Sequence, residues 1–202
     1  MSEQDARDWI AAHHGDEAVT RIGRFLDLVV DENGRQNLVA PSTIETIWQR
    51  HALDSVQLMR FDRPDTTWLD VGTGGGFPGI IVALLRPAPV VMIEPRKRRA
   101  QFLTDCIAAL DLSHARAFAT KVERWTEPAG VVSARAVASI DALFAATRQC
   151  AGVHTRWILP KGRTAGADLD DARRSWRGMF HVEQSIVEPE AGIVIAERLE
   201  RR

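Results

Sequence analysis

The stretch Trp68–Gly79, W-L-D-V-G-T-G-G-G-F-P-G, places five glycines directly behind a short apolar run that contains Asp70. This run has the length and composition of a buried strand, and the apolar residues 79–85 that follow favour a helix. Glycine tolerates positive φ and has no Cβ, so a ligand can lie against the backbone of such a turn. The pattern therefore predicts a strand, a ligand-binding turn and a helix, with Asp70, Gly72 and Gly74 at the ligand.

A second acid supports a nucleotide-like ligand. The apolar run Val90–Ile93 ends at Glu94, about twenty residues after the glycines, a spacing at which a carboxylate reaches ribose hydroxyls. We therefore predict that Glu94 binds the ribose. Two alternatives remain, since Gly74, Gly76 and Gly79 also fit the G-x-G-x-x-G pattern of dinucleotide folds and Glu94 could be a solvated acid beside a purely structural turn. A chain of 202 residues leaves no room for the separate substrate domain of a dinucleotide enzyme.

Composition narrows the class of protein. With 202 residues, 45% of them hydrophobic, the chain can bury one domain core but not two. The net charge of -1 hides the basic run Arg96–Arg99, so nucleic acid is not excluded as a partner. Cys106 and Cys150 lie in apolar helical patterns at no metal-ligand spacing, so we expect neither a disulfide framework nor a metal site. No signal peptide or long apolar stretch is visible, and we expect a cytoplasmic protein without a membrane segment.

The periodicity of the chain changes once. Residues 1–62 have helical spacing and are predicted to form a helical cap, whereas residues 63–202 alternate strand and helix as one compact unit with a mostly parallel sheet. The last two β-prone stretches, Met179–Val187 and Ile193–Leu199, are separated only by a short turn and predict an antiparallel hairpin at the end of the sheet. The other expected strands are Trp68–Val71, Val90–Ile93, Ala115–Ala119, Val131–Ala134 and Trp157–Leu159.

A seven-stranded α/β sheet with these features resembles the Rossmann-like class I S-adenosylmethionine-dependent methyltransferases. Further motifs occur in order over nearly the whole chain: N-L at Asn37, R-H-x-L-D-S from Arg50, the glycine stretch from Asp70, A-R-A-x-A-S from Ala134 and K-G at Lys161. This combination resembles the RsmG (GidB) family of bacterial small-subunit rRNA guanine-N7 methyltransferases. It is much more specific than the glycine stretch alone.

The resemblance implies S-adenosylmethionine as cofactor and 16S rRNA or the small ribosomal subunit as substrate, and we expect a monomer. It places Gly72 and Phe77 on the methionine and ribose side of the cofactor, Val122 and Glu123 beside the adenine, and Arg135 at the mouth shared by cofactor and substrate. The topology agrees, because Val122, Glu123 and Arg135 follow predicted strands and so lie at the carboxyl edge of the sheet, where open α/β folds bind ligands.

Methylation at guanine N7 requires no general base, because N7 carries a free lone pair. The protein must instead hold the reacting atoms in line at about 3 Å, and such positioning can supply roughly 7–11 kcal/mol. Arg135 is the predicted positioning residue, through guanine O6 or a phosphate, although an arginine at a strand end is also a common salt-bridge partner. Further candidates for RNA contact, each of which could equally be an ordinary surface or capping residue, are Asn37, Arg50, His51, Arg96, Arg99 and Lys161.

Two alternative functions remain at this point. A related methyltransferase could act on another RNA or on a small molecule and would keep the same cofactor site. A noncatalytic nucleotide-binding or RNA-binding assembly protein would bind without transferring a methyl group. The intact glycine stretch counts against the second alternative, and methyl transfer to defined RNAs distinguishes all three.

Overall fold

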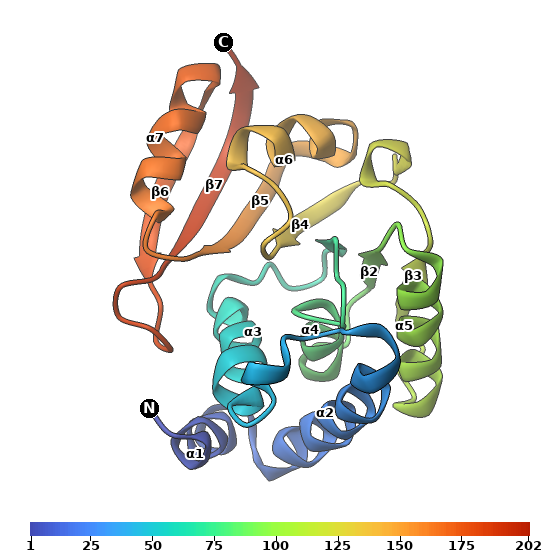
Figure 1. The fold of residues 1–202 in the computed structure, drawn as a ribbon. Coiled ribbons are helices and arrows are strands. Elements are labelled where there is room, and N and C mark those ends of the chain that lie inside the picture. Colours follow the sequence, from blue (N-terminus) through green and yellow to red (C-terminus); the bar gives the residue numbers. More distant parts are fainter.

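The computed structural model describes residues 1–202 and contains a single seven-stranded sheet covered by helices on both faces (Figure 1). The strand order is β3-β2-β1-β4-β5-β7-β6, in which β7 runs antiparallel to β5 and β6 and the remaining neighbours are parallel. The strands are β1 (Trp68–Val71), β2 (Val90–Ile93), β3 (Ala115–Phe118), β4 (Ala129–Ala134), β5 (Ala151–Lys161), β6 (Trp176–Gln184) and β7 (Gly192–Arg201). The predicted mostly parallel sheet with a final antiparallel hairpin is confirmed.

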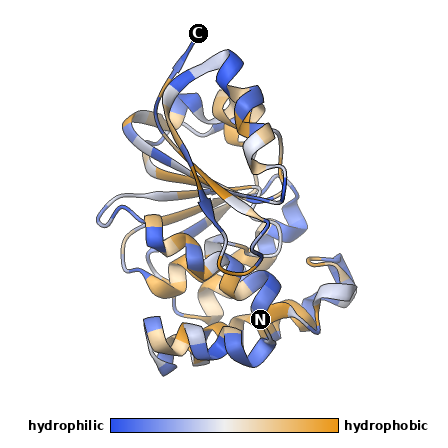
Figure 2. Ribbon diagram, turned by 90° about the vertical axis from the view of Figure 1, so that its left-hand side faces the viewer, coloured by the Kyte–Doolittle hydropathy of each residue, from blue (hydrophilic) through white to orange (hydrophobic).

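The helices form two layers that differ in size. On one face lie α1 (Glu3–His14), α2 (Asp16–Gln36), α3 (Asp54–Val56), α4 (Gly79–Leu85) and α5 (Lys97–Ala109), and on the other lie α6 (Ile140–Thr147) and α7 (Ala165–Ser175). Helical turns at Trp48–Leu53 and Gln57–Phe61 flank α3. Most helices carry both hydrophobic and hydrophilic residues, as Figure 2 shows, and can turn an apolar side toward the core, whereas α4 is apolar throughout. No helix combines the length and the apolar character needed to cross a bilayer.

The N-terminal helices share their core with the sheet. Ile22 and Phe25 of α2 belong to the same buried cluster as Trp68 of β1 and Met92 of β2. Residues 1–62 therefore contribute to the core on one face of the sheet, with α2 packed on the helices α4 and α5. The division of the chain into a helical cap, residues 1–62, and a second unit, residues 63–202, stays a prediction.

Each central strand is buried on both faces, which explains its continuous apolar run. In β1, Trp68 contributes to the core under α1–α5, whereas Leu69 and Val71 contribute to the core under α6 and α7. Asp70 breaks this pattern, because it is a fully buried acid in the middle of the strand. The hydrogen-bond donors to its carboxylate must therefore come from the protein itself.

The Asp70 carboxylate joins three elements. Ser133 of β4 donates its hydroxyl proton to Oδ1 at 2.6 Å, and the Gly79 N–H at the start of α4 donates to Oδ2 at 2.9 Å. Trp68 Nε1 in turn donates to the Ser133 Oγ at 2.7 Å. Burial raises the pKa of the Asp70 carboxyl to about 6, although these hydrogen bonds act in the opposite direction. This carboxylate thus fixes the glycine turn at both ends.

Replacing Asp70 should destabilise the fold in a way that depends on what takes its place. Asp70→Ala leaves a buried N–H and a buried hydroxyl without their acceptor, and we expect the free energy of unfolding to drop by roughly 2–5 kcal/mol in urea titration. Asp70→Asn keeps one acceptor oxygen and should cost less. Equal losses for the two variants would contradict this role of the carboxylate.

Asp70 should also leave a pH signature. Between about pH 4 and pH 6 the unfolded chain has released the Asp70 proton while the folded chain still holds it, because the folded pKa is about 6 and the ordinary value is 3.8. The stability of the wild type relative to Asp70→Asn should therefore fall as pH rises through this window, by about 3 kcal/mol in total. A pH-independent difference would show that the carboxyl titrates normally.

Candidate active site

The glycine turn, residues 72–78, connects β1 to α4, and Pro78 is the residue that precedes the first helical residue. Gly72, Gly74 and Gly76 all have positive φ, of 67°, 59° and 99°. At Gly76 a Cβ would lie 2.6 Å from the ring of Phe25, so close packing against α2 and the backbone conformation both require glycine there.

Glu94 is connected to the glycine turn by hydrogen bonds. It follows β2, and its Oε2 accepts from the Gly74 N–H at 3.0 Å while its Oε1 accepts from the Arg96 N–H at 2.9 Å. Each carboxylate oxygen can accept two hydrogen bonds and accepts one here, so each could accept another from a ligand hydroxyl, although Glu94 itself is buried. A Cβ on Gly74 would meet only Arg99 Nη1 at 3.7 Å and the Gly72 carbonyl at 3.8 Å, which leaves space on this face of the turn. The donor and acceptor set therefore fits a ribose.

Three predicted cofactor contacts have surroundings that do not point to a ligand. The Asp70 carboxylate points into the core, so its contact with a ligand stays a prediction. Val122 and Glu123 lie in a helical turn, Val122–Arg124, after β3, where the Val122 side chain is buried in the core and Glu123 is exposed. Neither side chain lines the two clefts described below, and their place beside the adenine also stays a prediction.

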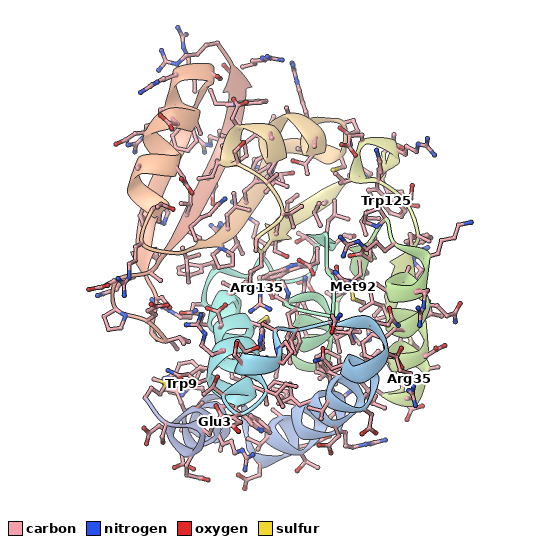
Figure 3. The ribbon with its side chains drawn as sticks, in the orientation of Figure 1. Glu3, Trp9, Arg35, Met92, Trp125 and Arg135 are labelled. Carbon is pink, nitrogen blue, oxygen red and sulfur yellow. The ribbon has the colours of Figure 1, made fainter.

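Arg135 follows β4 and sits near the middle of the molecule, between the sheet and α3 (Figure 3). Its guanidinium carbon lies 5.4 Å from the ring centre of Phe77 in the glycine turn. The same guanidinium donates to His51 Nδ1 at 2.9 Å, to Asp54 Oδ2 at 3.2 Å and to the Arg50 carbonyl at 3.2 Å. Arg135 is therefore held in one orientation by the R-H-x-L-D-S segment and the glycine turn together.

His51 acts as an uncharged acceptor in this cluster. Burial, followed by the nearby charges of Arg135 and Arg50, lowers its pKa to about 3. Because Nδ1 accepts from Arg135, the proton must reside on Nε2, which lies 2.8 Å from Thr43 Oγ1. The Thr43 hydroxyl in turn donates a hydrogen bond to the Ala40 carbonyl at 2.7 Å. The hydrogen-bond directions are thus consistent along the whole chain of contacts.

A cleft of about 400 Å³ opens over this cluster. It brings together four predicted site residues, Arg50, His51, Arg135 and Lys161, which come from three separate segments of the chain. Lys161, at the end of β5, donates to the Ala138 carbonyl at 2.9 Å. Most of the residues that line the cleft are polar or charged, which suits a polar substrate better than an apolar one.

Asn37, Arg96 and Arg99 lie in a different place. They line a second cleft of about 390 Å³ between the end of α2 and the start of α5, and the Arg99 guanidinium donates to the Asn37 carbonyl at 3.1 Å. The other lining residues are Arg35, Gln36, Lys97 and Arg98, so the lining contains no hydrophobic side chain and no acid. The predicted RNA contacts therefore divide into two groups, one in each cleft.

Several residues of the first cleft were missed by sequence reasoning. Thr43 and Glu188 line the cleft without a recognisable motif, and Glu188 pairs with Arg50, which is 138 residues away in the sequence. Gln57, which is fully buried and does not line the cleft, was missed as well, and it accepts from the Ile186 N–H, 129 residues away. Asp54 was visible only as part of the R-H-x-L-D-S motif.

No group of three or more His, Cys, Asp or Glu side chains is arranged to hold a metal ion.

Comparison with known sequences identifies one family. Residues 19–194 match the family model of GidB, described as rRNA small subunit methyltransferase G. Proteins named ribosomal RNA small subunit methyltransferase G are similar over almost the whole chain. The one from Sphingopyxis alaskensis is 41% identical over 96% of this chain and 85% of its own length, and the one from Erythrobacter litoralis is 38% identical over 96% and 95%.

Solved structures with low sequence identity share the fold. The tRNA methyltransferase TrmK of B. subtilis has a TM-score of 0.59 at 11% identity, covering 74% of this chain and 67% of its own. The precorrin-6y C5,15-methyltransferase of Geobacter metallireducens has a TM-score of 0.53 at 13% identity, covering 72% and 87%. The chain therefore has the class I methyltransferase fold, as its sequence predicted.

The uncharged state of His51 can be tested by pH. As pH falls from about 6.5 toward 3, the unfolded chain protonates His51 while the folded chain does not, because the ordinary pKa is 6.5 and the folded value is about 3. The wild type should therefore lose stability relative to His51→Asn, whose amide oxygen can replace Nδ1, with a slope approaching 1.4 kcal/mol per pH unit. Urea unfolding at pH 7, 6 and 5 measures it, and a constant difference would argue against the assignment.

Proposed function

Because this chain belongs to the GidB family of small-subunit rRNA methyltransferases, we propose that it transfers a methyl group from S-adenosylmethionine to N7 of a guanosine in 16S rRNA. The observation that carries the proposal is the placement of Arg135. This cation is fixed on Phe77 of the glycine turn and faces the polar cleft, so it stands between the predicted cofactor turn and the space for a substrate.

The glycine turn and Glu94 are the proposed cofactor residues that the local geometry supports best. The Glu94 carboxylate would accept the ribose hydroxyls, and the bare backbone at Gly74 would let the nucleoside approach closely. Gly72 and Phe77 are proposed on the methionine side, and Val122 and Glu123 beside the adenine. S-adenosylmethionine supplies the electrophilic methyl group when it is bound.

The side chains around the cleft suit a reaction that removes no proton. His51 is an uncharged acceptor occupied by Arg135, and the Asp54 carboxylate is paired with the same guanidinium, so neither is free to act as a base. Guanine N7 needs none. Two of the five guanidinium N–H groups of Arg135 are without a partner, and we propose that one of them donates to guanine O6 and thereby orients the base.

We propose that RNA phosphates contact both clefts, through Arg50 and Lys161 in the first and through Arg96 and Arg99 in the second, with Asn37 holding Arg99 in place. Cationic side chains attract the phosphate backbone irrespective of base sequence. Arg96 and Arg99 have no acidic partner, whereas Arg50 pairs with Glu188 at 3.2 Å and Lys161 lies 3.9 Å from Asp168. We further propose that the protein acts as a monomer in the cytoplasm, on 16S rRNA or on the assembled small subunit.

The test is transfer of labelled methyl from S-adenosylmethionine to small subunits, naked 16S rRNA and tRNA, each from cells that lack the gene, followed by mapping of the modified base. We expect one N7-methylguanosine in 16S rRNA, whether this RNA is methylated as naked rRNA, within small subunits or in both forms. Cofactor binding without transfer to any of them would refute the proposal.

Arg135 should affect catalysis through orientation. Arg135→Lys keeps the charge but cannot serve three acceptors and still reach the base, and a misplaced base costs on the order of 100-fold in kcat with a smaller change in KM. Steady-state kinetics on the accepted RNA would measure both constants. A change in KM alone would assign Arg135 to binding rather than to positioning.

The basic run can be tested independently of catalysis. Arg96→Glu together with Arg99→Glu should weaken binding to 16S rRNA and flatten its dependence on salt, because each lost phosphate contact lowers the slope of log K against log salt by about 0.7–0.9. Filter binding over a range of salt concentrations measures this slope. Unchanged binding would remove the second cleft from the RNA interface.

A further inference from the structure

The turn between β6 and β7, residues 185–191, reaches the first cleft and is called here the acidic turn. Gln57, which is fully buried beside α3, accepts from the Ile186 N–H at 2.9 Å and bonds to the Ser185 hydroxyl. The Ser185 Oγ accepts from the N–H groups of Val187 and Glu188, at 3.2 and 3.3 Å. The backbone of the acidic turn is therefore anchored by Gln57, a residue more than 120 positions away in the sequence. This anchor determines where the turn places its carboxylates.

Two carboxylates of the acidic turn neutralise arginines at the rim of the cleft. Glu188 lies between two guanidinium groups, with Oε2 at 3.2 Å from Arg50 Nη1 and Oε1 at 3.9 Å from Arg163 Nη2. Glu190 Oε2 lies 2.6 Å from Arg163 Nε. Two oxygens on one central atom that face two guanidinium groups form an arrangement that a phosphodiester also offers, since arginine recognises carboxylate and phosphate with the same geometry.

These ion pairs are exposed and therefore easy to exchange. The side chains of Arg50 and Glu188 are 50% and 40% exposed, and those of Arg163 and Glu190 are 72% and 64% exposed. Exposed pairs of this kind contribute at most about 1 kcal/mol each to stability. Their main consequence is electrostatic, because they cancel positive charge at the entrance to a cleft that must receive a polyanion.

We propose that Glu188 and Glu190 occupy the place of an RNA backbone phosphate, and that Arg163 and Arg50 bind this phosphate once the carboxylates are displaced. This inference rests on the proposed function for the identity of its ligand. An RNA gains affinity from these two arginines only if its backbone follows the contour of the cleft closely enough to replace the carboxylates. Other RNAs meet a neutralised rim, so the acidic turn selects against indiscriminate binding.

The experiment compares Glu188→Gln/Glu190→Gln with the wild type in binding to tRNA and to small subunits over a range of salt concentrations. We expect the affinity for tRNA at low salt to rise roughly three- to tenfold, as loss of two or three exposed ion pairs predicts. The slope of log K against log salt should steepen by about one to two, since two arginines become available to phosphates. Binding to small subunits should gain less, which lowers the preference for subunits over tRNA.

Two further variants make the test specific. Adding Arg163→Ala to the double variant should remove at least half of the gain in log K for tRNA. Glu127→Gln/Asp170→Asn is the matched control, because it makes the same change in net charge at two exposed ion pairs, Arg116–Glu127 and Arg173–Asp170, that lie outside the cleft. We expect a gain below twofold for the control.

Equal gains for the double variant and the matched control would overturn the inference, because net charge alone would then explain the effect. The inference would also be overturned if the gain in log K for tRNA stayed intact after Arg163→Ala. The same holds if the double variant had a lower melting temperature but unchanged RNA binding. Failure of the proposed function is seen separately, as absence of methyl transfer by the wild type to every RNA offered. RNA binding by the variants is measured without cofactor and does not depend on that result.

Discussion

The buried carboxylate of Asp70 is the contact on which the rest of the site depends. It accepts from the first residue of α4 and from Ser133 of β4, so it fixes where β1 stops, where the helix starts and how the two central strands are registered. The glycine turn spans the interval between these anchors. A charged group in this position is costly, as its raised pKa shows, and its burial is tolerated because donors from neighbouring elements surround it.

The turn in its anchored form presents Phe77, and Phe77 supports Arg135. Helix α2 contributes from the other side, since the Phe25 ring packs against Phe77 with ring centres 5.2 Å apart. His51, at 5.0 Å from the same ring, must stay uncharged to accept from Arg135. The N-terminal helical layer is therefore part of the site, because it holds Arg135, the cation that we propose to orient the substrate.

The charges around the site explain how a chain with a net charge of -1 can bind RNA. One cleft is lined by arginines and a lysine without acids, whereas the other has its rim arginines paired with Glu188 and Glu190. A uniformly basic surface would attract any nucleic acid. The combination of an open basic cleft and a neutralised one allows attraction at the first and discrimination at the second.

The sequence by itself determined the fold class, the mostly parallel sheet, the hairpin and the glycine turn, because local periodicity and glycine positions specify them. Its motifs also identified Arg50, His51, Arg135 and Lys161 as candidates. Only the tertiary structure decided that these four share one cleft, that Asn37, Arg96 and Arg99 belong to another, and that Asp70 points inward. The same holds for Gln57, Glu188 and Glu190. Their partners are distant in sequence, and no local pattern encodes a contact that exists only after the sheet and its two helical layers have packed.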